Sequence, residues 1–198
     1  MILRGTIAVA MLAAVGLTGC APVVVGGIAT GAVSAGQTRS TGEALTDAEI
    51  KLRVGDALLQ ADSTLFAQVE TSVTEGRVVL LGAVDSQGDR AQVERIALGI
   101  PDVREVINEL IVADRGLRNI ATDTRIDTEI TARLLAAEDV ASINYDVETV
   151  NGTVHLMGLA RSQVELERVA EIASRVSGVQ QVVSHVLLAD DPRRRSNG

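Results

Sequence analysis

The chain contains one sequence unit twice, at an offset of 76 residues. The clearest copy is a hydrophobic run bracketed by glycines at residues 76–82, which recurs at residues 152–158. The match continues without a gap over residues 46–114 and 122–190. Repetition of this kind indicates that one small domain is present twice. The two units account for most of the 198 residues, so the sequence predicts two tandem domains.

Each unit is predicted to fold as helix, strand, strand, helix, strand. In the first unit, Thr46 with Glu49 three residues later has the form of a capping box, which predicts that helix one begins there. Ser86 marks the predicted start of helix two, and Ser162 with Glu165 repeats the capping pattern in the second unit. The strands of the first unit are expected at residues 67–73, 77–84 and 103–112.

The turn between the first two strands is short in both units. Glu75-Gly76 and Asn151-Gly152 are typical of two-residue hairpin turns, which need residues with positive φ. The predicted fold class is α+β, with two tandem αββαβ units that each hold a three-stranded sheet covered by two helices on one face. The other face of each sheet is apolar, so we expect it to pack between the domains or against a partner. The residues assigned to this face are Val79, Leu81, Ile107 and Ile111, and in the copy His155, Met157, Val183 and Leu187.

The N-terminal segment has the pattern of a secretory signal peptide. One basic residue, Arg4, precedes an apolar run that is too short to be a stable membrane anchor. The run ends in Leu17-Thr18-Gly19-Cys20, which resembles the bacterial lipobox and implies a signal peptide at 1–19 and an acylated Cys20. The alternative is an ordinary thiol near an uncleaved terminus. The lipoprotein resemblance implies the outer membrane, because Ala21 and not Asp follows the cysteine.

Three connecting segments complete the organisation. Residues 20–45 are predicted to be a flexible tether, with self-association through a Gly27-x-x-x-Gly31 spacing as the alternative. Residues 115–121 are predicted to be the linker, and residues 191–198 a disordered, arginine-rich tail. The arginines of that tail either meet anionic lipid headgroups or simply keep the end of the chain soluble.

Charge and composition argue against a nucleic-acid partner. The formal net charge is −8, and loss of Arg4 with the signal peptide leaves 17 basic against 26 acidic side chains. Such a chain is repelled by nucleic acid unless it carries a local basic patch. Aromatic residues are limited to Phe66 and Tyr145, with no Trp, so the sequence offers no platform on which bases stack.

The residue types that carry catalysis do not cluster. His155 and His185 are the only histidines, and Val79 and Glu109 replace them in the first unit. A metal or acid–base site needs converging ligands, which no Cys, His or carboxylate cluster supplies. No glycine-rich phosphate loop or Gly-x-Ser-x-Gly motif occurs. The sequence therefore predicts no enzyme, no catalytic, cofactor-binding or metal-binding residues, no cofactor and no small-molecule substrate.

The order of elements, the glycine-bracketed strand and the run at residues 172–179 resemble the BON domain family. Two such domains behind a lipobox resemble the dual-BON outer-membrane lipoproteins associated with division and envelope stress. The resemblance covers residues 46–190 together with Cys20. It implies a non-catalytic periplasmic module that binds anionic phospholipid, chiefly through helix one of the second domain, and supports outer-membrane integrity.

The sequence departs from that family at one informative position. Where the most similar members carry an aromatic residue near the start of that helix, this chain has Arg125. Arginine pairs with phosphate but contributes little insertion into a bilayer. We therefore expect weaker, more salt-sensitive contact with lipid headgroups through Arg125, Thr128, Ala132 and Arg133.

The predicted partners are thus a membrane, held through the N-terminal acyl anchor and anionic headgroups, with envelope proteins as a further class. The alternative function is a periplasmic protein-binding or chaperone-like module that uses the open sheet faces or the strand edges.

Overall fold

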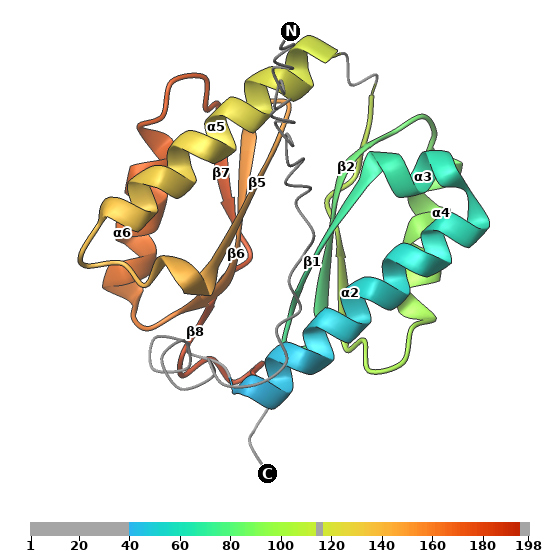
Figure 1. The fold of residues 1–198 in the computed structure, drawn as a ribbon, viewed down its shortest axis with the longest axis horizontal. Coiled ribbons are helices and arrows are strands. Elements are labelled where there is room, and N and C mark those ends of the chain that lie inside the picture. Colours follow the sequence, from blue (N-terminus) through green and yellow to red (C-terminus); the bar gives the residue numbers. More distant parts are fainter. Residues whose placement is uncertain (1–39, 114–116, 195–198) are drawn as a thin grey trace, which may run out of the picture.

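The computed structural model describes residues 40–113 and 117–194, which we call the first and second unit (Figure 1). The first unit begins with a long helix and a short one, continues with a β-hairpin, and ends with a third helix and two short strands. These elements are α2 (Thr41–Ala61), α3 (Ser63–Gln68), β1 (Val69–Thr74), β2 (Arg77–Val84), α4 (Gln87–Leu98), β3 (Glu105–Asn108) and β4 (Ile111–Val112).

The second unit repeats this order, with a 3-10 turn in place of α3. Its elements are α5 (Leu117–Ala136), η1 (Ser142–Asn144), β5 (Tyr145–Val150), β6 (Thr153–Ala160), α6 (Gln163–Ser174), β7 (Gln181–Ser184) and β8 (Leu187–Leu188). The predicted α+β class with two tandem units is therefore confirmed. Strand β2 has the predicted bounds.

The sheets have the same topology in both units. β1 is antiparallel to β2, and β3 and β4 run parallel to β2 on its other side, so β2 is central. The predicted single strand at 103–112 is divided into β3 and β4 around Glu109 and Leu110. At the break, the Asn108 side chain accepts a hydrogen bond from the Leu110 amide at 3.2 Å. The pairing with β2 keeps one offset across the break, with Leu80 opposite Asn108 and Ala83 opposite Ile111, so Leu110 still faces the core.

Both hairpin turns are formed as predicted. Glu75 and Gly76 have φ values of 53° and 77°, and Asn151 and Gly152 have 49° and 79°. Positive φ at both central residues is the geometry of a type I′ turn, which matches the twist of the flanking strands.

The predicted start of helix one at Thr46 is wrong. α2 begins at Thr41, and the capping box is formed by Ser40 and Glu43, whose carboxylate accepts from the Ser40 amide at 2.8 Å. Asp47, inside the misassigned box, instead accepts from the amides of Glu75 and Gly76 at 2.8 and 2.9 Å. The last residues of the predicted tether at 20–45 are thus helical and capped by Ser40, and residues 20–39 lie outside the described residues.

The second unit shows the same shift. α5 begins at Leu117, so most of the predicted linker at 115–121 is helix. Asp123 accepts from the amides of Asn151 and Gly152, as Asp47 does in the first unit. The strand predicted from residue 67 begins at Val69, because residues 63–68 form the short helix α3.

Helix two is capped by the predicted serines. The hydroxyls of Ser86 and Ser162 accept from the amides of Asp89 and Glu165. In a full capping box the Glu165 carboxylate would accept from the Ser162 amide. Here it accepts instead from the amides of Ala141 and Arg161, at 2.7 and 2.8 Å. Glu165 therefore fastens α6 to the segment that precedes η1.

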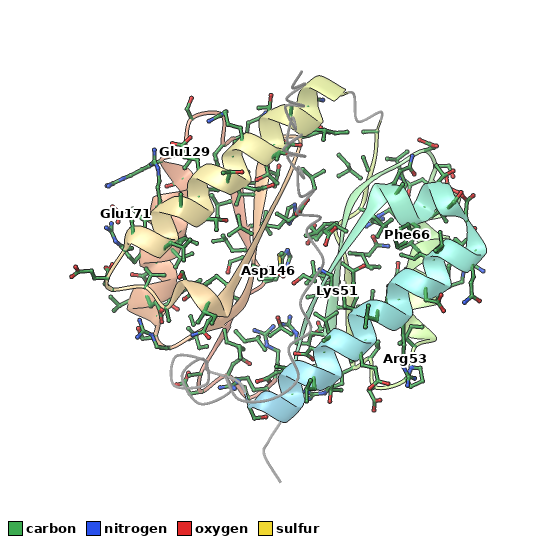
Figure 2. All side chains as sticks on the ribbon, viewed as in Figure 1. Lys51, Arg53, Phe66, Glu129, Asp146 and Glu171 are labelled. Atoms are coloured by element: carbon green, nitrogen blue, oxygen red, sulfur yellow. The ribbon has the colours of Figure 1, made fainter. Side chains whose placement is uncertain are left out.

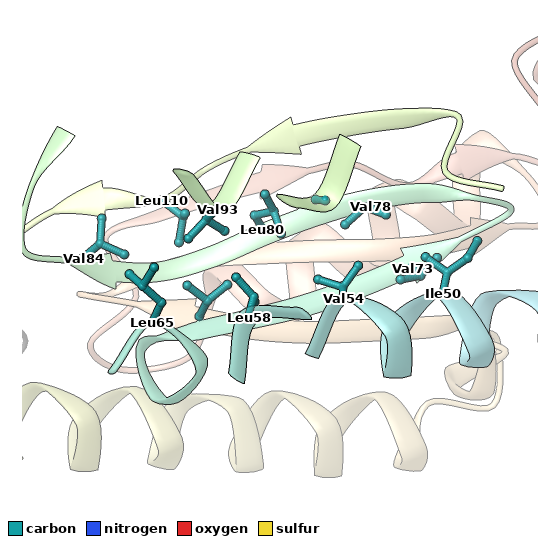
Figure 3. Close-up of a cluster of buried hydrophobic side chains, with 12 residues drawn as sticks. Ile50, Val54, Leu58, Leu65, Val73, Val78, Leu80, Val84, Val93 and Leu110 are labelled. Carbon is teal, nitrogen blue, oxygen red and sulfur yellow. The ribbon is translucent and has the colours of Figure 1, made fainter. Parts of the chain in front are cut away.

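Each unit has its own aliphatic core between its helices and its sheet. The buried stripe of α2 is Ile50, Val54 and Leu58, and the stripe of α5 is Ile126, Ile130 and Leu134. In the first unit they meet side chains from the central strand and from α4 (Figure 3). Burial of such side chains contributes about 1.5–3 kcal/mol each and is the main stabilising term.

The two sheets pack against each other through their helix-free faces. Figure 1 shows β1 and β2 facing β5 and β6 at the centre of the molecule. Val79, Leu81, Val150 and Met157 form one buried cluster between them, with Ile107 and Ile111 against it. The prediction that the apolar sheet faces pack between the domains is confirmed. The alternative function loses this binding surface, since the faces cover each other.

The two units are related by an approximate two-fold rotation. Figure 1 shows α2 and α5 on the near side of the molecule, running in opposite directions, with α4 and α6 behind them. Helix one of each unit therefore lies on the same broad face of the protein.

Candidate functional site

The four residues predicted to contact lipid lie together on the exposed surface of α5. Arg125, Thr128, Ala132 and Arg133 are all exposed. The first three follow one face of the helix at helical spacing, and Arg133 lies beside them. The side chains of Arg125 and Arg133 are 49% and 44% exposed, so both guanidinium groups are accessible from solvent.

A single carboxylate lies between the two arginines. Glu129 accepts from Arg125 at 2.9 Å and from Arg133 at 2.5 Å, and it points away from the molecule on the outer side of α5 (Figure 2). Two guanidinium groups and one carboxylate leave this group a net charge of +1. Exposed ion pairs of this kind contribute at most about 1 kcal/mol, so a phosphate can compete with Glu129 for either arginine.

Arg125 is also held by the neighbouring helix. Its Nη2 donates to the carbonyl of Ser177, just beyond the end of α6. The guanidinium is therefore placed over the gap between two elements and does not project freely. The Thr128 hydroxyl donates to the Thr124 carbonyl of its own helix at 2.8 Å.

A row of exposed leucines on α2 is the feature that the sequence analysis missed. Leu45, Leu52 and Leu59 are 68%, 74% and 50% exposed, and Phe66 on α3 is 47% exposed. These residues follow one another at intervals of seven, which places the three leucines on one face of the helix. That interval is visible in the sequence, although the exposure of the leucines is not. Scattered exposed leucines are ordinary, but a contiguous apolar patch marks an interaction surface.

A hollow lies beside this row, between α2, α3 and β1. Its walls include Leu52, Leu59 and Phe66, and Val69 contributes to its lining. Gly55 lies beside the Phe66 ring, which would be in ordinary contact, at 3.5 Å, with a Cβ at that position. The equivalent hollow in the second unit is lined by Leu135 and Ile143 among others.

The two histidines meet at the interface between the units. Their rings are stacked with centroids 5.6 Å apart and an interplanar angle of 5°. Nε2 of His185 lies 3.4 Å from Nδ1 of His155 and 3.6 Å from the Glu109 carboxylate of the first unit. The predicted sheet-face position is thus confirmed, but both rings are enclosed between the units.

Burial is the main influence on both imidazoles. It lowers the pKa of His155, and the neighbouring His185 lowers it further while Glu109 opposes the change. Burial also lowers the pKa of His185, with Arg77 acting in the same direction and Glu109 against it. Arg77 donates to the His185 carbonyl at 3.3 Å and pairs with Glu105 at 2.6 Å. The cluster thus favours neutral rings at neutral pH.

The predicted disorder of the tail is wrong for its first residues. Arg194 pairs at 2.8 Å with the carboxylate of Glu75, a residue with no exposed surface, at the hairpin turn of the first unit. Arg193 pairs with Asp191 and lowers the pKa of that carboxyl to about 2. These two arginines already have partners within the protein, and residues 195–198 lie outside the described part.

Cys20, the predicted acylation site, also lies outside the residues that the structure describes. Among the described residues, no helix is long and apolar enough to cross a membrane. Within the same ranges, no group of three or more His, Cys, Asp or Glu side chains is arranged to hold a metal ion.

Comparison with known proteins identifies the repeated unit. The model of the BON domain matches residues 46–114 and again residues 122–190. The chain belongs to the BON domain family. The first BON domain contains Leu52 and Leu59 of the leucine row, with Leu45 directly before it, and the second contains the arginines of α5.

Three curated relatives are similar over most of the chain. The chain is 40% identical over 153 residues to an uncharacterized protein in the gshII 5′ region of Anaplasma centrale, covering 76% of this chain and 100% of that protein. It is 29% identical to the outer membrane lipoprotein DolP of Haemophilus influenzae, and the similarity covers 89% of this chain and 92% of that protein. It is 33% identical to the osmotically-inducible protein Y of Escherichia coli, and the similarity covers 71% of this chain and 72% of that protein.

Proposed function

We propose that this protein is a non-catalytic lipoprotein of the outer membrane, facing the periplasm, that binds anionic phospholipid and supports the integrity of the envelope. Acylated Cys20 is the anchor, and α5 of the second BON domain makes additional contacts with headgroups. The observation that carries the proposal is the exposed pair Arg125 and Arg133 around Glu129. The similarity to an outer membrane lipoprotein over 89% of this chain supports the location.

The electrostatics of α5 define the kind of contact. An anionic headgroup replaces Glu129 as the partner of one or both guanidinium groups, which bind phosphate with charge-assisted hydrogen bonds. Because both arginines are exposed, the attraction is screened by salt over a Debye length of about 8 Å at physiological ionic strength. Each basic residue near an anionic surface contributes about 1 kcal/mol. Stable attachment therefore depends on the acyl chains, and α5 determines how the second domain lies against the lipid.

Fractionation of cells tests the anchor. Cys20→Ser is expected to release the protein from the outer-membrane fraction, because α5 alone binds weakly. If the variant stays with the outer membrane as before, the acyl anchor is refuted.

Co-sedimentation with vesicles tests α5. The full chain carrying Cys20→Ser is expected to bind phosphatidylglycerol vesicles more tightly than phosphatidylcholine vesicles. Arg125→Glu with Arg133→Glu should reduce this binding at least about tenfold, by reversing two attractive charges. Arg168→Glu with Arg175→Glu is the control, since these two exposed arginines flank Glu171 as Arg125 and Arg133 flank Glu129, and the change in charge is the same. Equal loss in the control would mean that only net charge matters.

A further inference from the structure

We infer that α2 of the first BON domain docks on the same bilayer as α5, and that its leucine row enters the boundary between headgroups and acyl chains. This inference rests on the proposed function, since it adds a second contact to the same membrane. Leu45, Leu52 and Leu59 supply the buried apolar area, and α5 supplies the cations. The first domain thus contributes burial of apolar surface, and the second contributes electrostatic attraction.

The arrangement of the two domains permits both contacts at once. α2 and α5 lie on one broad face and run in opposite directions (Figure 1). The leucine row of α2 corresponds to the predicted contact face of α5 at the 76-residue offset: Leu52 is equivalent to Thr128, and Leu59 to Leu135. Surfaces that look along the two-fold axis point the same way in both domains, and both helices lie on the side of the molecule through which this axis passes, so a flat surface can reach both (Figure 1).

The polar residues around the leucine row have partners on their own protein. Glu49 pairs with Arg53 at 2.6 Å, and Asp56 accepts from Gln60 at 2.6 Å. Lys51 pairs with Glu70 at 3.1 Å across to the edge strand. These groups carry two positive and three negative charges, so the row offers burial of apolar surface and no electrostatic attraction for an anionic headgroup. Its contribution to binding is therefore expected to be insensitive to salt, unlike that of α5.

The position of α2 in the chain favours a bilayer as the partner that covers the leucine row. Ser40, the cap of α2, is the 20th residue after Cys20, so an extended chain spans at most about 70 Å between them. An acylated Cys20 therefore keeps α2 at high local concentration next to the lipid. A second copy of the chain is less favoured, because a stable protein interface needs about 20–30 residues on each side and the row offers three leucines and Phe66.

The single cysteine of the chain allows a direct measurement of depth. Cys20→Ser leaves the full chain without cysteine. One cysteine is then introduced at Leu52 on α2, at Thr128 on α5, or at Leu98 on α4 as the control. Leu98 is 59% exposed and belongs to the helix behind α2. Each variant is labelled with an environment-sensitive dye and mixed with phosphatidylglycerol–phosphatidylethanolamine vesicles that contain spin-labelled lipid.

Quenching is expected at positions 52 and 128 and not at 98, with deeper quenching at 52. In the unlabelled Cys20→Ser chain, Leu52→Ser with Leu59→Ser should weaken vesicle binding about tenfold or more at low and high salt, while Leu98→Ser leaves it unchanged. Circular dichroism confirms that the variants are folded.

The possible failures are distinguishable. If position 128 is quenched, position 52 is not, and Leu52→Ser with Leu59→Ser leaves affinity unchanged, the inference about α2 is overturned while the proposed function stands. If the chain binds no vesicle at all, both are overturned. If the leucine variants change the mass of the chain in sedimentation equilibrium but not its vesicle binding, the row joins two copies and the inference is also overturned.

Discussion

Glu109 and His185 occupy equivalent positions in the two BON domains and meet each other across the domain interface, with 3.6 Å between Oε1 and Nε2. A residue that contacts its own equivalent lies close to the two-fold axis, so this pair marks the axis. The two copies differ there, with a carboxylate in the first domain and an imidazole in the second. A single chain can hold such an asymmetric pair, which a dimer of identical domains cannot.

Stability is expected to fall as the pH is lowered through the range below 6.5. Burial lowers the pKa values of His155 and His185 below their ordinary value of 6.5, so the folded state binds fewer protons than the unfolded state in that range. Unfolding is then coupled to proton uptake, and the free energy of unfolding rises with pH. Thermal unfolding measured at pH 7.5 and pH 5.5 checks the sign.

His155→Val is the matched variant, because Val79 stands at the equivalent position of the first domain. Its loss of melting temperature between the two pH values should be smaller than that of the natural chain. An equal loss in both proteins would show that other groups cause the pH dependence.

Removal of Arg194 is expected to destabilise the protein by about 2–3 kcal/mol. Glu75 has no exposed surface, so the variant removes one charged partner of a carboxylate that water does not reach. Chemical denaturation of Arg194→Ala measures the change.

A double-mutant cycle isolates the pair. Glu75→Asn copies Asn151 of the second domain, so the turn keeps a residue that tolerates positive φ. In that background, Arg194→Ala should cost less than about 1 kcal/mol. Arg193→Ala, at an exposed pair with Asp191, should have little effect.

Gly82→Ala should be among the most damaging single-methyl changes in the first domain. Gly82 has a φ of 121°, and an added Cβ would lie 2.1 Å from the carbonyl oxygen of Gln68. Both the conformation and the clash require the backbone to move, at a cost of about 3 kcal/mol or more. Gly42→Ala on α2 is the control, because nothing lies within 4 Å of its added Cβ and the helix gains about 0.5 kcal/mol. Similar stabilities of the two variants would contradict this account.

Asp123→Ala is expected to cost about 2 kcal/mol, because it leaves the amides of Asn151 and Gly152 without their acceptor. Hydrogen exchange at these two amides should accelerate more than exchange at the centre of β6. Asp139→Ala removes a carboxylate from an exposed pair with Arg168 and should change neither measurement. Unchanged exchange at Asn151 and Gly152 would mean that Asp123 does not hold the turn.

The parts of the fold that depend on local pattern were predictable from the sequence. β2 is buried on both faces, so its apolar run marks it, and it starts directly after Gly76 and continues through Gly82 to Val84. The start of α2 was not predictable, because Ser40–Glu43 and Thr46–Glu49 both have the capping pattern, and the distant turn at Glu75 decides which one forms. The pairing of Arg194 with Glu75 likewise has no local signal.

The predicted contact residues on α5 are exposed and adjacent, which follows from helical spacing alone. Their arrangement around Glu129, and the hydrogen bond from Arg125 to the end of α6, depend on packing between helices. The leucine row of α2 had a seven-residue signal, but a sequence shows only that leucines recur and not which of them the core leaves outside.

The contact between Glu75 and Arg194 joins residues that are 119 positions apart in the chain. The hairpin of the first BON domain therefore gains this ion pair only after residue 194 has been synthesised and the second domain has folded beside it. A chain truncated before Arg194 would keep a weak point at that turn, which limited proteolysis can detect.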